Sequence, residues 1–201
     1  MLSESAIESQ EVVITGQSKA TEIKRSPVPV SVINNQYLRT NISTNIIDAI
    51  AKVPGVSAIA SGPNISKPVI RGLGFNRVLT LYNGMRQEGQ QWGDEHGIEV
   101  DEYSIDKVEL VKGPSSLIYG SDALAGVVNL IPTKPTQEGK IAGEFASEYQ
   151  SNNGLIGMTG MLSGNNKGFF WLGRASYKMA KNYQNSVDGR VYRTNYNSIY
   201  D

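Results

Sequence analysis

Several residue types and patterns that mark common protein classes are missing from this chain of 201 residues. It contains no cysteine, which excludes a disulfide scaffold, a thiol nucleophile and a zinc site built from cysteine ligands. Its 19 Lys and Arg residues balance 19 Asp and Glu residues, so the formal net charge is +0. A domain that binds nucleic acid usually carries a basic patch, and the balanced charge therefore argues against nucleic acid as a partner.

Long apolar runs and an export signal are also missing. No run approaches the roughly 18 consecutive apolar residues of a membrane helix. The first residues, MLSESAIESQ, are acidic and polar, whereas a secretory signal begins with basic residues and continues with an apolar stretch. We expect any export signal to have been removed or to lie outside this chain. Membrane β-strands remain possible, because their alternating pattern gives a low average hydropathy.

Glycine and tyrosine are abundant, with 21 Gly and 10 Tyr, and their uneven distribution divides the chain into three regions. Residues 1–26 are too polar to bury much surface and form a predicted flexible segment. Its apolar, β-branched residues form one short island that favours an extended conformation: Glu11, Val12, Val13, Ile14, Thr15 and Gly16. Such an island can add as a strand to the sheet edge of a partner, or it can be the first strand of the following domain.

Residues 27–135 have the pattern of a compact α+β domain. The helix signal runs from Asn41 to Lys52, where Ser43 or Thr44 can cap the first turn and Pro54 follows the last. The remaining apolar segments predict strands at 27–33, 56–60, 68–70, 78–82, 105–111 and 127–131. Asn83 and Gly84 predict a tight turn after the fourth of these strands.

Residues 136–201 alternate with a period of two, which predicts antiparallel strands joined by turns at 151–154 and 164–168. In the third strand, Phe169, Trp171, Gly173, Ala175 and Tyr177 share one face, and Phe170, Leu172, Arg174, Ser176 and Lys178 share the other. Strands of this kind fit a membrane barrel, but a soluble antiparallel sheet alternates in the same way and is favoured by this region alone. An open sheet edge in lipid leaves backbone groups unsatisfied, so strands that face lipid would belong to a longer chain.

Residues 107–135, KVELVKGPSSLIYGSDALAGVVNLIPTKP, resemble the plug domain of TonB-dependent outer-membrane receptors. The resemblance rests on Lys-Gly-Pro at 112–114, Tyr-Gly at 119–120 and Gly-Val-Val-Asn at 126–129, while Ala125 stands where Gly is usual. Blocks at 46–57, 69–72 and 79–86 match in order. The segment 11–16 resembles the TonB box, and residues 136–201 resemble the first strands of the barrel.

The resemblance implies an α+β plug domain followed by antiparallel β-strands of a truncated transmembrane β-barrel. Residues 1–26 would be a periplasmic segment with the TonB box, residues 27–135 the plug, and residues 136–201 the first barrel strands. The implied function is active transport of a ferric siderophore, haem, cobalamin or another metal complex across the bacterial outer membrane. TonB, with its inner-membrane energising complex, and outer-membrane lipid are the implied partners. No cofactor and no catalytic residue are expected.

The segment 89–103, GQQWGDEHGIEVDEY, is long for a connection inside a compact domain, and the resemblance implies that it faces the ligand at the plug apex. The predicted ligand-binding residues are Gln90, Gln91, Trp92, Asp94, Glu95, His96, Glu99 and Asp101. His96 with Asp94 and Glu95 is a candidate for direct metal contact through nitrogen and oxygen ligands, or His96 makes only local hydrogen bonds in a solvated acidic loop. Arg71, Arg77 and Arg86 are further ligand candidates, although salt bridges inside the plug are an alternative role for Arg71 and Arg77.

Two functions without transport compete with this interpretation. An enzyme is not supported, because the chain has no Gly-x-Ser-x-Gly elbow, Walker loop or His-x-x-x-His pair. The sequence RGLGFN at 71–76 lacks the third glycine of a dinucleotide-binding fingerprint. A soluble secreted binding module with an α+β core and a β-meander explains the strands, but it gives no role to the segment 11–16 or to an exposed aromatic face.

Overall fold

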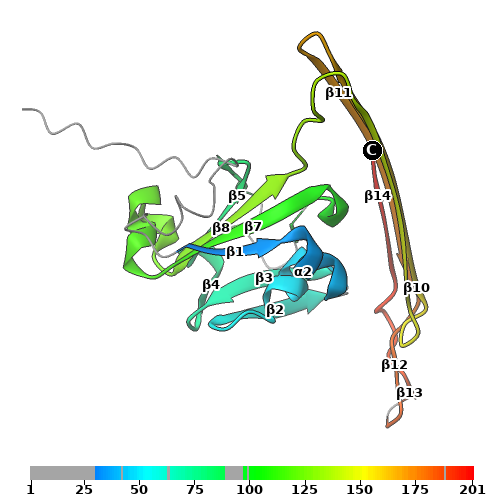
Figure 1. The fold of residues 1–201 in the computed structure, drawn as a ribbon. Helices are drawn as coiled ribbons and strands as arrows, with labels where there is room; N and C mark the ends of the chain where they lie inside the picture. The colour runs from blue at the N-terminus through cyan, green and yellow to red at the C-terminus, as the bar shows by residue number, and fades with distance from the viewer. Residues whose placement is uncertain (1–29, 42, 63, 89–96, 99, 188) are drawn as a thin grey trace, which may run out of the picture.

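The computed structural model describes residues 30–201 except 42, 63, 89–96, 99 and 188 (Figure 1). An N-terminal domain of two sheets and two short helices is followed by a long curved sheet that stands beside it. No helix within the described part of the chain is both long enough and apolar enough to cross a membrane. The predicted TonB box at 11–16 lies outside the described residues.

The larger sheet of the N-terminal domain has the strand order β1-β7-β8-β5-β6. Its strands are β1 (Val30–Asn34), β5 (Val78–Tyr82), β6 (Met85–Arg86), β7 (Ile105–Lys112) and β8 (Gly126–Pro132). Strand β7 pairs antiparallel with β1 and β8, whereas β5 pairs parallel with β8. The predicted tight turn joins β5 to β6, with positive φ angles of 50° at Asn83 and 81° at Gly84.

The Lys-Gly-Pro and Gly-Val-Val-Asn segments form the connection from β7 to β8. Gly113 has a φ of 85°, which suits glycine, and the 3-10 turns Pro114–Tyr119 and Ser121–Ala123 follow it. A Cβ atom at Gly126 would lie 2.5 Å from the Val111 carbonyl oxygen, so the two strands can approach only at a glycine. Asn129 accepts a hydrogen bond from the Gly84 amide at 3.1 Å and donates one to Glu109 at 3.3 Å, which ties the β5–β6 turn to β7.

The smaller sheet has the strands β2 (Val56–Gly62), β3 (Ile65–Ile70) and β4 (Leu73–Gly74), and the helices are α2 (Asn35–Thr40) and α3 (Ile46–Ile50). The predicted helix at 41–52 is therefore shorter, and its cap is Asn45, whose side chain accepts a hydrogen bond from the Asp48 amide at 3.0 Å. The isoleucines of α3 bury their side chains in one core with residues from both sheets: Ile46, Ile47, Ile50, Ile70, Val108, Leu110 and Leu130.

The curved sheet has the strand order β14-β11-β10-β9, and every pair of neighbours is antiparallel. Its strands are β9 (Ile141–Gln150), β10 (Leu155–Asn166), β11 (Phe169–Ala180) and β14 (Tyr196–Tyr200). A hairpin of β12 (Gln184–Asn185) and β13 (Gly189–Arg190) extends between β11 and β14. The three predicted strands are confirmed, although β10 continues through 164–166 and leaves a turn at Lys167 and Gly168.

The two faces of the curved sheet differ in chemistry. The face toward the N-terminal domain carries polar and charged side chains, among them Glu148, Thr159 and Lys178, which are buried or half-buried. The opposite face carries large apolar side chains that are exposed, as for Ile141 at 78% and Phe145 at 75%. A soluble sheet buries its apolar face and exposes its polar face, so this sheet has the reverse arrangement.

Candidate functional site

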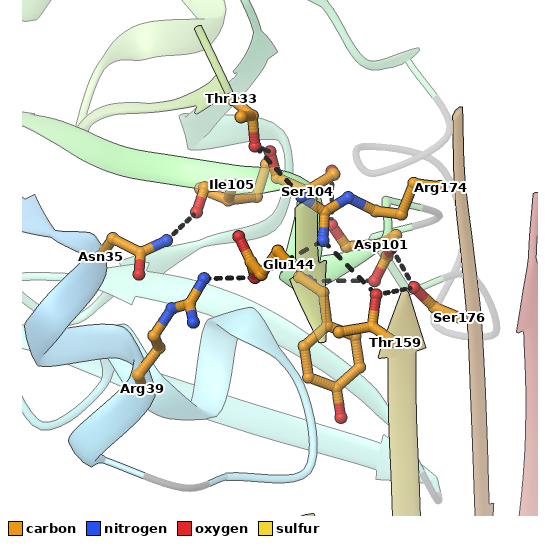
Figure 2. A network of polar contacts seen from close by, with 11 residues as sticks. Asn35, Arg39, Asp101, Ser104, Ile105, Thr133, Glu144, Thr159, Arg174 and Ser176 are labelled. Atoms are coloured by element: carbon orange, nitrogen blue, oxygen red, sulfur yellow. Dashed lines mark hydrogen bonds and ion pairs between the residues drawn. The ribbon is translucent and has the colours of Figure 1, made fainter. Parts of the chain in front are cut away.

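The polar face of the curved sheet meets the N-terminal domain along a line of contacts that we call the seam. Its centre is the 3-10 turn η3 (Glu102–Ser104), which comes at the end of the predicted ligand segment. The Asp101 carboxylate accepts a hydrogen bond from the Tyr103 amide at 3.0 Å and another from the Ser176 hydroxyl of β11 at 2.7 Å (Figure 2). Asp101 therefore caps η3 and fixes it to the sheet.

Lys178 is shared by two carboxylates at the seam. Its ammonium group forms an ion pair with Glu102 of η3 and another, at 2.9 Å, with Glu148 of β9. It also donates a hydrogen bond to the Thr44 carbonyl oxygen at 3.1 Å. The Lys178 side chain is only 6% exposed and that of Glu102 20%. Burial raises the pKa of the Glu102 carboxyl to about 7, although the Lys178 ammonium acts in the opposite direction.

Gly157 of β10 stands between the partners of this ion pair. It is paired with Glu148 on one side and with Lys178 on the other, so the three residues form one row across the sheet. Tyr103 lies over the glycine, and its ring centroid is 5.6 Å from the Lys178 ammonium group, within range of a cation–π interaction. Burial and the neighbouring carboxylates raise the pKa of the Tyr103 hydroxyl, so this group stays protonated.

Arg174 connects the seam to the link, residues 133–140, which joins the N-terminal domain to the curved sheet. Its guanidinium group donates hydrogen bonds of 3.4 Å to the Thr133 and Thr159 hydroxyls, as Figure 2 shows. The Thr133 amide in turn donates to the Ser104 carbonyl oxygen at 2.8 Å. The start of the link, η3 and β11 thus form one hydrogen-bonded unit.

On the other side of η3, α2 faces β9 with fewer contacts. Arg39 forms an ion pair with Glu144, and Gln150 donates a hydrogen bond of 3.5 Å to the Ser43 carbonyl oxygen. Between these contacts lies a cavity of about 200 Å³. Side chains from both parts of the chain line it, including Asn35, Arg39, Ala49, Tyr103, Ala146 and Glu148.

The predicted site residues fall into two groups. Asp101 lies at the seam, with both carboxylate oxygens engaged within the protein. The others, Gln90, Gln91, Trp92, Asp94, Glu95, His96 and Glu99, lie outside the described residues, as do the three metal candidates among them. The described residues contain no group of three His, Cys, Asp or Glu side chains placed to hold a metal ion.

Two of the arginine candidates lie within the N-terminal domain. Arg86 forms an ion pair with Asp122 inside the N-terminal domain, and a Cβ atom at Gly113 would lie 2.7 Å from the Arg71 guanidinium group. Glu102, Gly157 and Lys178 were not predicted as functional residues. The available signal was the placement of charged residues on the less apolar face of strands 141–150 and 169–180.

Residues 22–127 match the family model of the TonB-dependent receptor plug domain. The iron-regulated outer membrane virulence protein of Vibrio cholerae is 32% identical over 148 residues, which are 70% of this chain and 22% of that protein. The hemin receptor of Yersinia enterocolitica is 33% identical over 119 residues, which are 59% of this chain and 17% of that protein. This chain therefore spans about a fifth of the length of these relatives.

Solved structures share the fold at lower identity. The hemophore receptor HasR of Serratia marcescens, in complex with its hemophore and heme, has a TM-score of 0.76 and 20% identity, covering 88% of this chain and 28% of that one. The copper transporter OprC has a TM-score of 0.68 and 19% identity, covering 86% of this chain and 27% of that one. These likenesses confirm the predicted α+β domain followed by antiparallel strands. Since the family match alone covers more than half of the residues, this chain belongs to the family of TonB-dependent receptors and carries their plug domain.

Proposed function

We propose that this chain is the plug and the first wall strands of a receptor that imports a scarce metal complex across the bacterial outer membrane, driven by TonB. The observation that carries the proposal is the reversed arrangement of the curved sheet. Its polar face packs on the plug and its apolar face points outward, as in a barrel whose outer surface contacts lipid and whose lumen is polar.

The outward face is apolar on each of the three long strands. It presents large side chains that are between 38% and 78% exposed: Ile141, Phe145, Tyr149, Ile156, Met158, Leu162, Phe169, Trp171 and Tyr177. In water this much contiguous apolar surface is unfavourable, and in lipid its transfer is favourable by about 25 cal/mol for each Å². Lipid is therefore the environment that suits this face.

The loops support an orientation. In outer-membrane barrels the periplasmic turns are short and the outer loops are longer. The turn at 167–168 is short, whereas β11 and β14 are joined by a longer connection whose strands β12 and β13 lie at the opposite end of the sheet (Figure 1). Lys178 comes two residues before the end of β11 on the hairpin side, so η3 would lie in the outer half of the barrel. That position favours a ligand role for the segment 89–103.

The relatives support a metal complex as the ligand class. Those that match include proteins named as an iron-regulated outer membrane protein, a hemin receptor and a vitamin B12 transporter. We therefore propose a ferric siderophore, haem, cobalamin or another metal complex as the ligand. We propose that residues 11–16 pair with TonB from the periplasm, because an extended segment can add a strand to the sheet of a partner.

A charge on the outward face tests this function against a soluble binding module. In the full-length protein, Leu162→Arg should lower stability by about 2–4 kcal/mol and reduce the amount of folded protein in the outer membrane, because the arginine would enter lipid. Asn152→Arg, in an exposed turn, is the control and should have little effect. If Leu162→Arg leaves folding and membrane insertion unchanged, the outward face is in water and the proposed function is wrong.

A further inference from the structure

We propose that one end of the curved sheet carries a binding site for a phosphorylated saccharide. The site is a pocket of about 640 Å³ beside β12 and β13, at the point where β14 begins (Figure 1). Its lining residues all lie between Met179 and Asn197, so the plug contributes none of them. The position of the pocket at the outer surface of the membrane rests on the orientation proposed above, whereas the ligand class follows from the lining residues.

The pocket has the size of a ligand site and a polar lining. Pockets for small molecules typically have volumes of about 300–1,000 Å³, and the volume of this pocket lies within that range. No Asp or Glu occurs among the described residues that line it. Its polar lining residues carry either cationic or carboxamide groups: Lys181, Asn182, Gln184, Arg190, Asn195 and Asn197.

The two cations are available to an anion. Lys181 and Arg190 are exposed, and neither has a carboxylate partner within the described part of the chain. A guanidinium group can donate two parallel hydrogen bonds to a phosphate, and an ammonium group adds a compact positive charge. A phosphate monoester carries about −1.5 to −2 charge and three acceptor oxygens, so it can use both cations at once. A single carboxylate would neutralise only one of them.

The carboxamide groups match the hydroxyl groups of a sugar. A carboxamide both donates and accepts hydrogen bonds, as a hydroxyl does, so the two groups can pair in either direction. Gln184 of β12 is paired directly with Arg190 of β13. Residues opposite each other on antiparallel strands share one face, with Cβ atoms about 4.5–5.5 Å apart. One molecule can therefore contact a carboxamide with its hydroxyls and a cation with its phosphate.

Hydrogen bonds hold the lining residues in place without a ligand. The Gln184 amide donates to the Asn152 carbonyl oxygen at 3.0 Å, and the Lys181 amide donates to the Asn153 carbonyl oxygen at 2.9 Å. The side-chain oxygen of Asn182 accepts a hydrogen bond from the Thr194 amide at 3.1 Å, which leaves its two N–H donors for a ligand. A site that is already formed spends less binding free energy on ordering its own residues.

The pocket borders the apolar outward face of the sheet. Met179 of β11 and Asn197 of β14 are paired and line the pocket. The preceding pair on the same face is Tyr177 with Ile199, whose side chains are 39% and 72% exposed. In the proposed orientation the pocket therefore lies at the outer limit of the surface that contacts lipid. A phosphorylated saccharide can reach it as the headgroup of a glycolipid in the outer leaflet or as a soluble molecule.

Binding by the full-length receptor in detergent tests the site. The probe is a soluble bisphosphorylated glucosamine disaccharide, at an ionic strength of about 0.15 M, where the Debye length is about 8 Å. Arg190→Gln and Lys181→Gln should each weaken binding about tenfold or more, because each removes a hydrogen bond to a charged group. Arg193→Gln is the matched control, since it removes the same charge from the same connection but lies outside the lining. Equal weakening by Arg190→Gln and Arg193→Gln, or no binding by the wild type, overturns the proposal.

Two further measurements identify the ligand and its source. Gln184→Met should weaken binding of the disaccharide but not of inorganic phosphate, and equal effects on both probes would exclude recognition of the sugar. The receptor is also reconstituted into phosphatidylcholine vesicles with and without a glycolipid that has the same headgroup. Competition by the glycolipid supports the site with a lipid headgroup as its ligand, and lack of competition supports it with a soluble saccharide. None of these affinities depends on uptake, so a wild-type receptor that imports no metal complex would count against the proposed function alone.

Discussion

Tyr103 of the plug lies so close to Gly157 of the curved sheet that position 157 has no space for a side chain. A Cβ atom there would lie 2.8 Å from the Glu148 Cγ atom, and the Tyr103 hydroxyl oxygen is closer still. Glycine at this position therefore lets one aromatic ring cover the row that contains the ion pair between Glu148 and Lys178.

Gly157→Ala should loosen the plug in the barrel. The methyl group has to displace the Tyr103 ring, and overpacking of this kind typically costs about 1–3 kcal/mol. Faster proteolysis of the plug in the intact receptor would report the change. Gly160→Ala on the same strand is the matched control, since nothing lies within 4 Å of a Cβ atom there. Equal proteolysis of the two variants would contradict the close fit.

Lys178→Met should destabilise the receptor far more than loss of an exposed ion pair. It leaves Glu102 and Glu148 side by side without a cation, and removal of one partner from a buried pair costs about 3–5 kcal/mol. Asp122→Asn breaks the exposed pair with Arg86 and should cost less than about 1 kcal/mol. Urea unfolding of the full-length receptor in detergent measures both losses. Similar losses would mean that the seam charges are solvated.

Plug docking should weaken as pH rises through the titration of Glu102. The pKa of the Glu102 carboxyl is about 7 when the plug is packed on the curved sheet and 4.5 ordinarily, so the packed state binds the proton more tightly. The stabilisation that this proton gives to the packed plug is complete below pH 4.5 and is lost as pH rises to about 7. The free energy that holds the plug on the sheet should fall by up to ~3 kcal/mol over this range. The difference in stability between wild type and Glu102→Gln, measured from pH 4 to about 8, isolates this carboxyl from Asp101 and Glu148. A constant difference would show that Glu102 does not titrate in this range.

The strands and turns were predictable because their signals are local. The period of two placed Phe169, Trp171 and Tyr177 on one face, and Asn83 with Gly84 marked the tight turn. The helix was predicted too long, because Ser43 and Thr44 looked as suitable for the cap as Asn45. Helix α2 has no buried residue, so no apolar periodicity marked it.

The seam could not be predicted in the same way. Glu102 and Lys178 are 76 residues apart, and nothing local to either residue indicates its partner. The alternation in β9–β11 is equally compatible with a soluble sheet. The sequence does not indicate which face of the sheet packs on the plug, and the structure shows that it is the polar face. Asp101 is an example. Its position in an acidic loop favoured a prediction of ligand binding, whereas its contacts fix the plug to the curved sheet.

His96→Ala tests direct metal contact in the ligand segment. If His96 binds the metal together with Asp94 and Glu95, its loss should weaken binding of the metal complex by at least about 10–100-fold. A loss of that size is typical even for a residue that only hydrogen-bonds a metal ligand. Calorimetry of the full-length receptor with zinc, iron and copper forms measures the change. Glu88→Ala, an exposed acidic residue just before the segment, should leave the affinity unchanged. Unchanged affinity of His96→Ala for all three forms would exclude metal contact at this residue.

Val13→Pro separates energy coupling from ligand recognition. Strand addition to TonB requires the backbone amides of residues 11–16, and proline removes one amide while fixing φ. Uptake of labelled ligand should therefore stop, whereas binding of ligand at the cell surface should persist, because the ligand segment is remote in sequence. Ser18→Pro, two residues beyond the TonB box, should retain uptake because the paired amides are intact. Normal uptake by Val13→Pro would show that residues 11–16 do not pair with TonB as a strand, and the coupling segment would then have to be sought elsewhere in residues 1–26.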